Sequence, residues 1–246
     1  MSTNQIVFIG GLHRSGTTIL HNIIGAQPQV SAFKIPGVTK NEGQYLQTVF
    51  KKEKDCGGVG KLALNQDAHL TEKSVVNRKG ERRQLLEDWT PHWNPEKKIW
   101  LEKTPFNILK MRYLQELFPE AKFINLIRHP IAVSYASKKW TKTTMPNLLK
   151  NWIAAHEIYK NDLPYITTNI EIRYENFAEN PLLILSQIEK ELGIDINYDG
   201  RFKNKNKKYF DEWQKSAGLG LFNSKKGIIK KYNEKINQFG YDLNLD

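Results

Sequence analysis

The chain has 246 residues, of which 39% are hydrophobic and 26% charged, and its formal net charge is +11 at pH 7. This composition argues against a globally disordered chain or a disulfide-stapled miniprotein, and it favours one soluble domain over residues 1–246. With a single cysteine, Cys56, the sequence predicts neither an internal disulfide nor a cysteine-based metal site.

The first hundred residues predict a strand, a helix and then a long irregular insertion. QIVFIGG (5–11) is an apolar run closed by two glycines, which predicts a strand, and SGTTILHNIIGAQP (15–28) has helical spacing. Between about 34 and 98, glycines and scattered charges predict loops with one short helix around 42–50. Such an insertion is suited to close over a site.

The rest of the chain continues to alternate between strands and helices. The predicted elements are KKIWLEKTP (97–105, strand), NILKMRYLQELFP (107–119, helix), AKFINLIRHP (121–130, strand), IAVSYASKKW (131–140, helix), MPNLLKNWIAAHEIYK (145–160, helix), YITTNIEIRYENF (165–177, strand) and NPLLILSQIEKELG (180–193, helix). This alternation indicates parallel strands covered on both faces. We therefore expect an α/β protein with three layers, α/β/α, around a central parallel sheet.

The surface charge and the lack of sorting signals restrict partners and location. The sequence has no run of about eighteen apolar residues and no signal-peptide pattern at its start, so we expect no membrane span and a cytoplasmic location. Lysines and arginines gather in a basic C-terminal segment at about 198–246, where RFKNKNKKYF (201–210) is predicted to be a loop. This segment is either a solvated face or a site for a polyanion, and it carries no nucleic-acid-binding motif.

GLHRSGTTIL (11–20) has the Gly-x4-Gly spacing of a phosphate-binding loop at the junction of the first strand and helix. In such a loop, backbone N–H groups and the helix N-terminus hold the anion. Thr17 stands where a nucleotide triphosphatase has its lysine, and Arg14 supplies positive charge earlier in the loop. The loop is therefore predicted to hold a phosphate or sulfate without a metal partner, and the alternative is a plain strand-to-helix turn.

Three segments in this order, FIGGLHRSGTTIL, LEKTPFN and LFPEAKFINLIRHPIAVSYASKKW, resemble the sulfotransferases that use 3′-phosphoadenosine 5′-phosphosulfate (PAPS). They are most similar to the tyrosylprotein branch and its bacterial relatives, and EIRYENFAENPLLILSQIEKELG resembles a later strand and helix of these enzymes. The resemblance implies a P-loop-like sulfotransferase fold, PAPS as donor, adenosine 3′,5′-bisphosphate (PAP) as product, no metal, and a bacterial cytoplasmic setting.

The resemblance also assigns roles residue by residue. It implies that Lys103 reaches the transferring sulfuryl group and that Arg128 binds the 3′-phosphate. The serine expected eight residues after Arg128 is Ala136 here, so Ser134 and Ser137 are alternatives. The remaining implied nucleotide-binding residues are Arg14, Ser15, Gly16, Thr17 and Thr18 in the loop, Tyr174, and Lys225 and Lys226 within a Ser-Lys-Lys-Gly segment at 224–227.

The catalytic base is not settled by the sequence. Relatives place a glutamate or histidine between the first loop and the lysine, but SAFKIPG stands where the tyrosylprotein branch has its glutamates. Glu42 and His69 are the candidates, with Glu42 favoured, and His13 in the loop is a third. Glu102 is an alternative partner that could hold Lys103 in place through an ion pair.

Sulfuryl transfer explains these residue types, because positive groups stabilise charge that builds on the bridging oxygen as the bond to phosphate breaks. We expect an acceptor hydroxyl or amine on a small molecule, a glycan or a peptide, no nucleic-acid partner, and a monomer or homodimer. A P-loop nucleotide kinase or phosphotransferase is the first alternative, and a basic polyanion-binding protein is the second.

Overall fold

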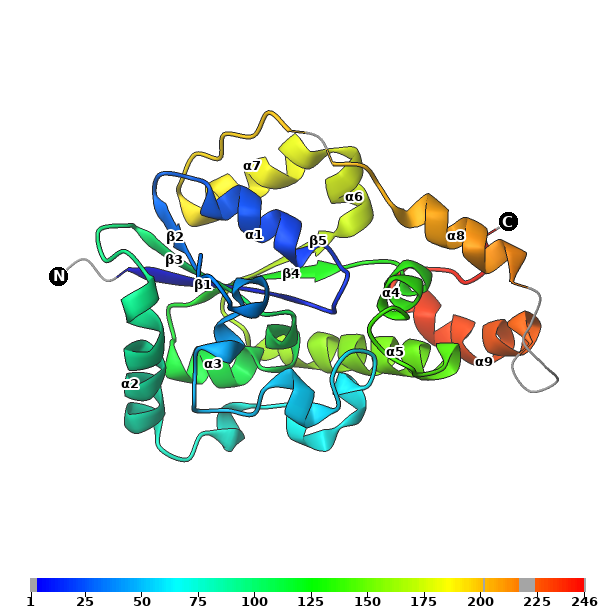
Figure 1. The fold of residues 1–246 in the computed structure, drawn as a ribbon, viewed down its shortest axis with the longest axis horizontal. Coiled ribbons are helices and arrows are strands. Elements are labelled where there is room, and N and C mark those ends of the chain that lie inside the picture. The colour runs from blue at the N-terminus through cyan, green and yellow to red at the C-terminus, as the bar shows by residue number, and fades with distance from the viewer. Residues whose placement is uncertain (1–3, 201, 217–223, 246) are drawn as a thin grey trace.

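The computed structural model describes residues 4–200, 202–216 and 224–245, and its centre is a sheet of parallel strands (Figure 1). The strand order is β2-β3-β1-β4-β5, and every neighbouring pair is parallel. The strands are β1 (Gln5–Gly11), β2 (Val30–Ala32), β3 (Ile99–Lys103), β4 (Lys122–Ile127) and β5 (Asn169–Arg173). Because all strands run the same way, their carboxyl ends share one edge of the sheet.

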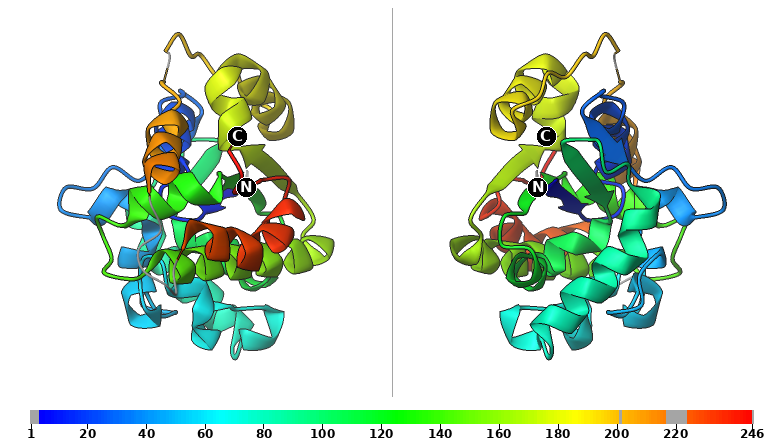
Figure 2. Two further views of the ribbon diagram at one scale, coloured as in Figure 1. Left: turned by 90° about the vertical axis from the view of Figure 1, so that its right-hand side faces the viewer. Right: turned by 90° about the vertical axis from the view of Figure 1, so that its left-hand side faces the viewer.

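Helices cover both faces of this sheet, so the predicted three-layer α/β/α fold is confirmed (Figures 1 and 2). One face carries α1 (Thr17–Gly25), α6 (Tyr174–Glu179) and α7 (Pro181–Leu192). The opposite face carries α2 (Arg78–Trp89), α3 (Met111–Leu117), α5 (Met145–Asp162) and α9 (Lys225–Asn237). Beyond the end of β4, α4 (Pro130–Ser137) packs against α8 (Asn206–Lys215), as the left view of Figure 2 shows.

The alternation of side chains along β1 divides the core into two layers. Phe8 belongs to the cluster under α2 and α3, whereas Val7 and Ile9 belong to the cluster under α1 and α7. All three side chains are fully buried. A strand buried on both faces reads as a continuous apolar run, which is why QIVFIGG predicted a central strand correctly.

Several sequence expectations differ from the structure. The strand expected at 165–177 is shorter, because β5 ends at Arg173 and α6 begins at Tyr174. The helix expected at 42–50 is wrong, because the only helical turn there is the short 3₁₀ segment Gly43–Tyr45. The insertion at 34–98 instead contains α2, whose sequence is too polar to show a helical stripe, since only Leu85 and Trp89 are buried. The loop expected at 201–210 is wrong from Asn206 onward, where α8 begins.

Over the residues that the structure describes, we find no helix that combines the length and apolar character needed to cross a membrane.

Candidate functional site

The site lies where β1, β3 and β4 end, because their register brings the following residues together. Ile9 of β1 pairs with Lys103 of β3, and Gly11 of β1 pairs with Leu126 of β4. The loop that leaves β1 needs glycine at both ends. A Cβ on Gly11 (φ 137°) would lie 2.5 Å from the carbonyl oxygen of Leu126, and one on Gly16 (φ 103°) would lie 2.9 Å from the Tyr174 ring.

The loop presents unused hydrogen-bond donors at the N-terminus of α1. Gly16 caps α1 without a side chain, and its carbonyl accepts from the amides of Ile19 and Leu20, so the amides of Thr17 and Thr18 are the first-turn donors without an intrahelical acceptor. Ser15 is fully buried, and its Oγ has no hydrogen-bond partner within residues 4–200, 202–216 and 224–245. Thr17 is buried, whereas Arg14 and Thr18 are exposed, and Arg14 has a left-handed backbone (φ 71°). This arrangement of donors fits an anion.

Arg128 lies directly behind this loop, where β4 ends. Its Nη1 donates to the main-chain oxygen of Arg14 at 2.7 Å, and its guanidinium lies 3.9 Å from the centre of the Tyr174 ring. The side chain is buried, which lowers its pKa, but a guanidinium remains charged in a protein. Nη2 has no acceptor among the described residues, so one arm of this cation is left for a ligand.

The Nε of Arg128 is held by α8, a contact that the sequence did not predict. Nε donates to Asn206 Oδ1 at 2.8 Å, and Asn206 Nδ2 donates to Glu175 Oε1 at 2.6 Å. Tyr241 donates to the other carboxylate oxygen of Glu175 at 3.0 Å. The C-terminal segment therefore orients Arg128 through Asn206. Asn206 belongs to the Lys/Asn stretch that was expected to be a loop, and no motif marks it.

The two serines proposed as partners of Arg128 both lie on α4 and are both buried. Ser134 Oγ is fully enclosed and has no hydrogen-bond partner in the described part of the chain. A helical serine commonly bonds the carbonyl four residues earlier, so an unpaired buried hydroxyl is unusual. Ser134 therefore has an unused hydroxyl donor.

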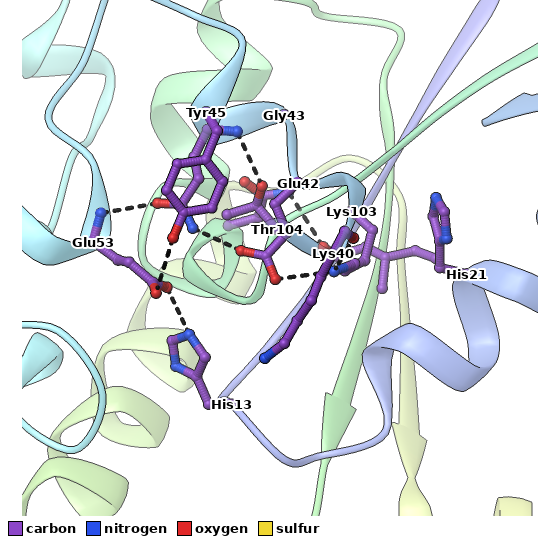
Figure 3. A network of polar contacts seen from close by, with 12 residues as sticks. His13, His21, Lys40, Glu42, Gly43, Tyr45, Glu53, Lys103 and Thr104 are labelled. Atoms are coloured by element: carbon purple, nitrogen blue, oxygen red, sulfur yellow. Dashed lines mark hydrogen bonds and ion pairs between the residues drawn. The ribbon is translucent and has the colours of Figure 1, made fainter. Parts of the chain in front are cut away.

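Lys103 ends β3 and is fully buried in a polar cluster (Figure 3). Its Nζ donates to Glu42 Oε1 and to the main-chain oxygen of Lys40, each at 3.0 Å. Burial lowers the pKa of Lys103, and the Glu42 carboxylate opposes this shift. Lys40 and Asn41 reach this position with left-handed backbones (φ 51° and 53°). The structure thus brings together Lys103 and Glu42, which are 61 residues apart in the sequence.

The cluster continues from Glu42 back to the loop. Gln44 Nε2 donates to Glu42 Oε2 at 2.8 Å, and Gln44 Oε1 accepts from the Glu53 amide at 2.8 Å. The Glu53 carboxylate in turn lies 2.6 Å from His13 Nε2 (Figure 3). A continuous polar chain therefore links His13 to Lys103. Glu53 was missed by the sequence reasoning, since nothing in the insertion marks it.

Glu102 has a different role from the one considered for it. Its carboxylate accepts from the Gly43 amide at 2.8 Å and from Thr104 Oγ1 at 2.6 Å, and Asn107 donates to its other oxygen. Burial raises its pKa. Glu102 therefore fixes the turn that carries Glu42, and Glu42 is the carboxylate that contacts the Lys103 amine.

Other predicted residues lie away from the cluster. His69 Nε2 pairs with Asp162 at 2.9 Å, at the end of α5, and none of its contacts within the described ranges reaches Lys103 or the loop. Lys225 begins α9 with its amine 5.5 Å from the Trp213 ring, and Lys226 is exposed. No contact among the described residues joins either lysine to Arg128.

A family model described as "Sulfotransferase family" matches residues 6–198. Among curated relatives, the chain is 26% identical over 212 residues to protein-tyrosine sulfotransferase A of Caenorhabditis elegans, covering 81% of this chain and 52% of that protein. It is 28% identical over 201 residues to the Drosophila melanogaster protein-tyrosine sulfotransferase, covering 78% of this chain and 38% of that protein. The chain thus spans about half or less of the length of these relatives.

Solved structures show the same fold at low identity. The sulfotransferase domain of the Synechococcus PCC 7002 olefin synthase superposes with a TM-score of 0.58 at 17% identity, covering 98% of this chain and 96% of that one. The sulfotransferase domain of the curacin biosynthetic pathway gives 0.56 at 16% identity, covering 98% and 99%. Because the family model covers most of the sequence, and a fold of the same kind is shared over 98% of the chain, the chain belongs to the sulfotransferase family.

Proposed function

We propose that the protein transfers the sulfuryl group of PAPS to an acceptor hydroxyl or amine by in-line displacement, without a metal ion. The observation that carries this proposal is the set of buried donors without partners around the loop. Within the described residues these include Ser15 Oγ, Arg128 Nη2 and Ser134 Oγ. Leaving such groups unpaired costs about 1–3 kcal/mol each, so they favour a polyanionic ligand that restores the missing bonds.

Two separate anionic groups match the distribution of these donors. The loop and the N-terminus of α1 would hold the 5′-phosphosulfate through Ser15, Thr17, Thr18 and the main chain, as anions bind at helix N-termini. Arg128, Ser134 and Tyr174 would hold the 3′-phosphate on the other side of Gly16. A nucleotide with phosphate on both the 3′ and 5′ positions satisfies both groups of donors.

Lys103 and Arg14 would stabilise the charge that develops on the bridging oxygen of the phosphosulfate. Removing one preorganised donor of this kind typically costs about 2.7–4 kcal/mol of barrier. Glu42 fixes the position of the Lys103 amine, which is needed because a lysine on a flexible stem has many rotamers. Chemistry of this kind relies on positioning and electrostatics rather than on a covalent intermediate.

A P-loop kinase is the second candidate. It would need a lysine at position 17 to contact the terminal phosphates, and Thr17 occupies that position. A kinase would also need magnesium, and the calorimetric titration described below tests whether binding depends on that ion.

For the acceptor we propose a hydroxyl on a small molecule, a glycan or a peptide. Two of the relatives are named protein-tyrosine sulfotransferases, which makes a tyrosyl hydroxyl the first to test. We further propose that the protein works as a monomer or homodimer in a bacterial cytoplasm.

Calorimetric titration with PAP in EDTA tests the donor site. We expect tight binding by the wild type and a loss of about 10–150-fold in Arg128→Ala, the range for hydrogen bonds to a charged group. The matched control is Arg78→Ala, an exposed arginine on α2. Absence of PAP binding by the folded wild type, or binding only after magnesium is added, would overturn the proposal in favour of a kinase or a polyanion-binding protein.

A further inference from the structure

His13 occupies an unusual position for a histidine, between the last glycine of β1 and Arg14 of the phosphate-binding loop. Its side chain is only 9% exposed, and its Nε2 lies 2.6 Å from Glu53 Oε2 (Figure 3). Nδ1 forms no hydrogen bond within the part of the chain that the structure describes. The contact is a close ion pair without hydrogen-bond alignment, and a carboxylate this near to Nε2 favours the proton on that nitrogen and leaves the lone pair on Nδ1 available.

Glu53 is built to remain ionised as the partner of this imidazole. Burial alone would raise the pKa of the Glu53 carboxyl, yet His13 and Gln44 hold it below its ordinary value. Tyr45 also donates to the carboxylate, at 3.4 Å, and Gln44 accepts from the Glu53 amide. The carboxylate is therefore fixed from several sides, as expected of a group that orients a histidine.

Glu42, the base favoured from the sequence, is fully committed to other contacts. Oε1 accepts from Lys103 and Oε2 accepts from Gln44, and the residue is 2% exposed. Taking a proton on either oxygen would break one of these bonds and would remove the charge that holds the Lys103 ammonium. The geometry therefore favours Glu42 as the residue that positions Lys103.

We infer that His13 is the base that takes the acceptor's proton, and that Glu53 is its positioning residue. This inference rests on the proposed sulfuryl transfer. In the step, the acceptor O–H bond breaks and its proton goes to Nδ1 of His13, while the acceptor oxygen forms a bond to sulfur. The bond from sulfur to the phosphate oxygen breaks with both electrons, so PAP leaves with the added negative charge. The imidazolium is stabilised by the Glu53 carboxylate until it returns the proton to water.

The test compares two phenols of similar shape with ³⁵S-labelled PAPS in EDTA, in single-turnover reactions at about pH 8. 4-Methylphenol keeps its proton there, like a tyrosine with its pKa of about 10, whereas 4-nitrophenol is largely ionised and needs no base. We expect His13→Ala to slow transfer to 4-methylphenol by about 10²–10⁴-fold, the usual contribution of a general base. Transfer to 4-nitrophenol should change far less.

Glu53→Gln should change the ratio of the two rates in the same direction, which a merely structural role would not do. Lys103→Met should slow both phenols equally, because it acts on the leaving group. His92→Ala, an exposed histidine outside the cluster, is the matched control and should leave both rates unchanged. Water is the third acceptor, and transfer to it is measured in every reaction as labelled sulfate. The rate of sulfate release should fall in His13→Ala.

PAP binding by each variant separates the two levels of the argument. If the wild type fails to bind PAP, the proposed function itself is wrong. If PAP binds and label is transferred, but the ratio for the two phenols is the same in wild type and His13→Ala, only the role of His13 is overturned. A changed ratio in His69→Ala or Glu42→Gln, with His13→Ala unaffected, would also overturn it. PAP binding without transfer to any of the three acceptors would overturn the proposed sulfuryl transfer itself.

Discussion

The ammonium of Lys103 donates to Glu42 Oε1 at 3.0 Å, and both side chains are buried at the carboxyl end of β3. The pair is thus withdrawn from water in a molecule with an excess of positive charge. Buried ion pairs give little net stability, but losing one partner leaves an uncompensated charge. Variants that remove one or both partners of this pair can therefore distinguish its effect on stability from its effect on activity.

Lys103→Met should lower kcat by about 10²–10³-fold and leave PAP affinity nearly unchanged, because the amine acts on charge that develops during transfer. The same change should cost about 3–5 kcal/mol of stability, since Glu42 stays buried without its partner. Adding Glu42→Gln should restore stability but not activity, as measured by urea unfolding and by transfer from labelled PAPS. Lys122→Met, at the opposite end of the sheet, is the control. If Lys103→Met retained full activity, the amine would have no role in transfer.

Ser134→Ala should weaken PAP binding about fivefold, the loss of roughly 1 kcal/mol from one hydrogen bond. The free protein should be as stable or more stable, because the change removes a buried hydroxyl that has no partner among the described residues. Calorimetry and thermal unfolding give the two quantities. Ser137→Ala is the comparison and should keep PAP affinity, so the reverse pattern would assign the 3′-phosphate to Ser137.

Asn206→Ala should lower PAP affinity by about fivefold to tenfold, because Arg128 loses the acceptor that fixes its Nε, a bond worth about 1 kcal/mol. The maximal transfer rate should stay close to that of the wild type. Gln214→Ala, in the last turn of the same helix, controls for general effects on α8. Unchanged affinity in Asn206→Ala would mean that Arg14 and Tyr174 suffice to orient Arg128.

Acidification should destabilise the fold between about pH 6.5 and pH 4 through buried neutral histidines. Burial lowers the pKa of His156 and of His129 from 6.5 to about 4. In this window the unfolded chain binds more protons than the folded one, so the free energy of unfolding falls as pH falls and levels off above 6.5. Each histidine contributes at most about 3 kcal/mol over the range.

Urea unfolding at several pH values measures this dependence. His156→Phe keeps the stacking on Trp152 but cannot titrate, so its stability should fall less steeply below pH 6.5 than that of the wild type. His92→Phe should leave the slope unchanged, because the parent residue is exposed. Parallel curves for wild type and His156→Phe would contradict the role of His156.

The positions of the residues proposed to bind the nucleotide could be predicted from the sequence, because these residues are tied to strands. Lys103 and Arg128 each end or follow an apolar strand, and the carboxyl ends of parallel strands meet at one edge. Gly11 and Gly16 mark the loop at a turn where a side chain would collide with neighbours. The local sequence is sufficient to predict where residues of this kind lie in the fold.

The acceptor side could not be predicted in the same way. Glu53 contacts His13 across forty residues of chain that has no periodic pattern, and its pairing follows from how the 3₁₀ turns at 43–45 and 53–56 fold back. On the nucleotide side, Asn206, which orients Arg128, could not be predicted either, because it lies in a lysine-rich segment whose helix is amphipathic mainly through Trp213. Such contacts depend on tertiary packing between residues that are far apart in the sequence, and no local sequence pattern indicates them.

The turn at Lys40 and Asn41 is held in a strained backbone conformation. Two consecutive non-glycine residues with φ of 51° and 53° store backbone strain of about 1–3 kcal/mol each. The bond from the Lys103 ammonium to the Lys40 carbonyl holds the turn in that state. The Lys103 ammonium is therefore one of the groups that hold the insertion in place, and a change that neutralises Lys103 should let residues 39–41 relax and become sensitive to proteases.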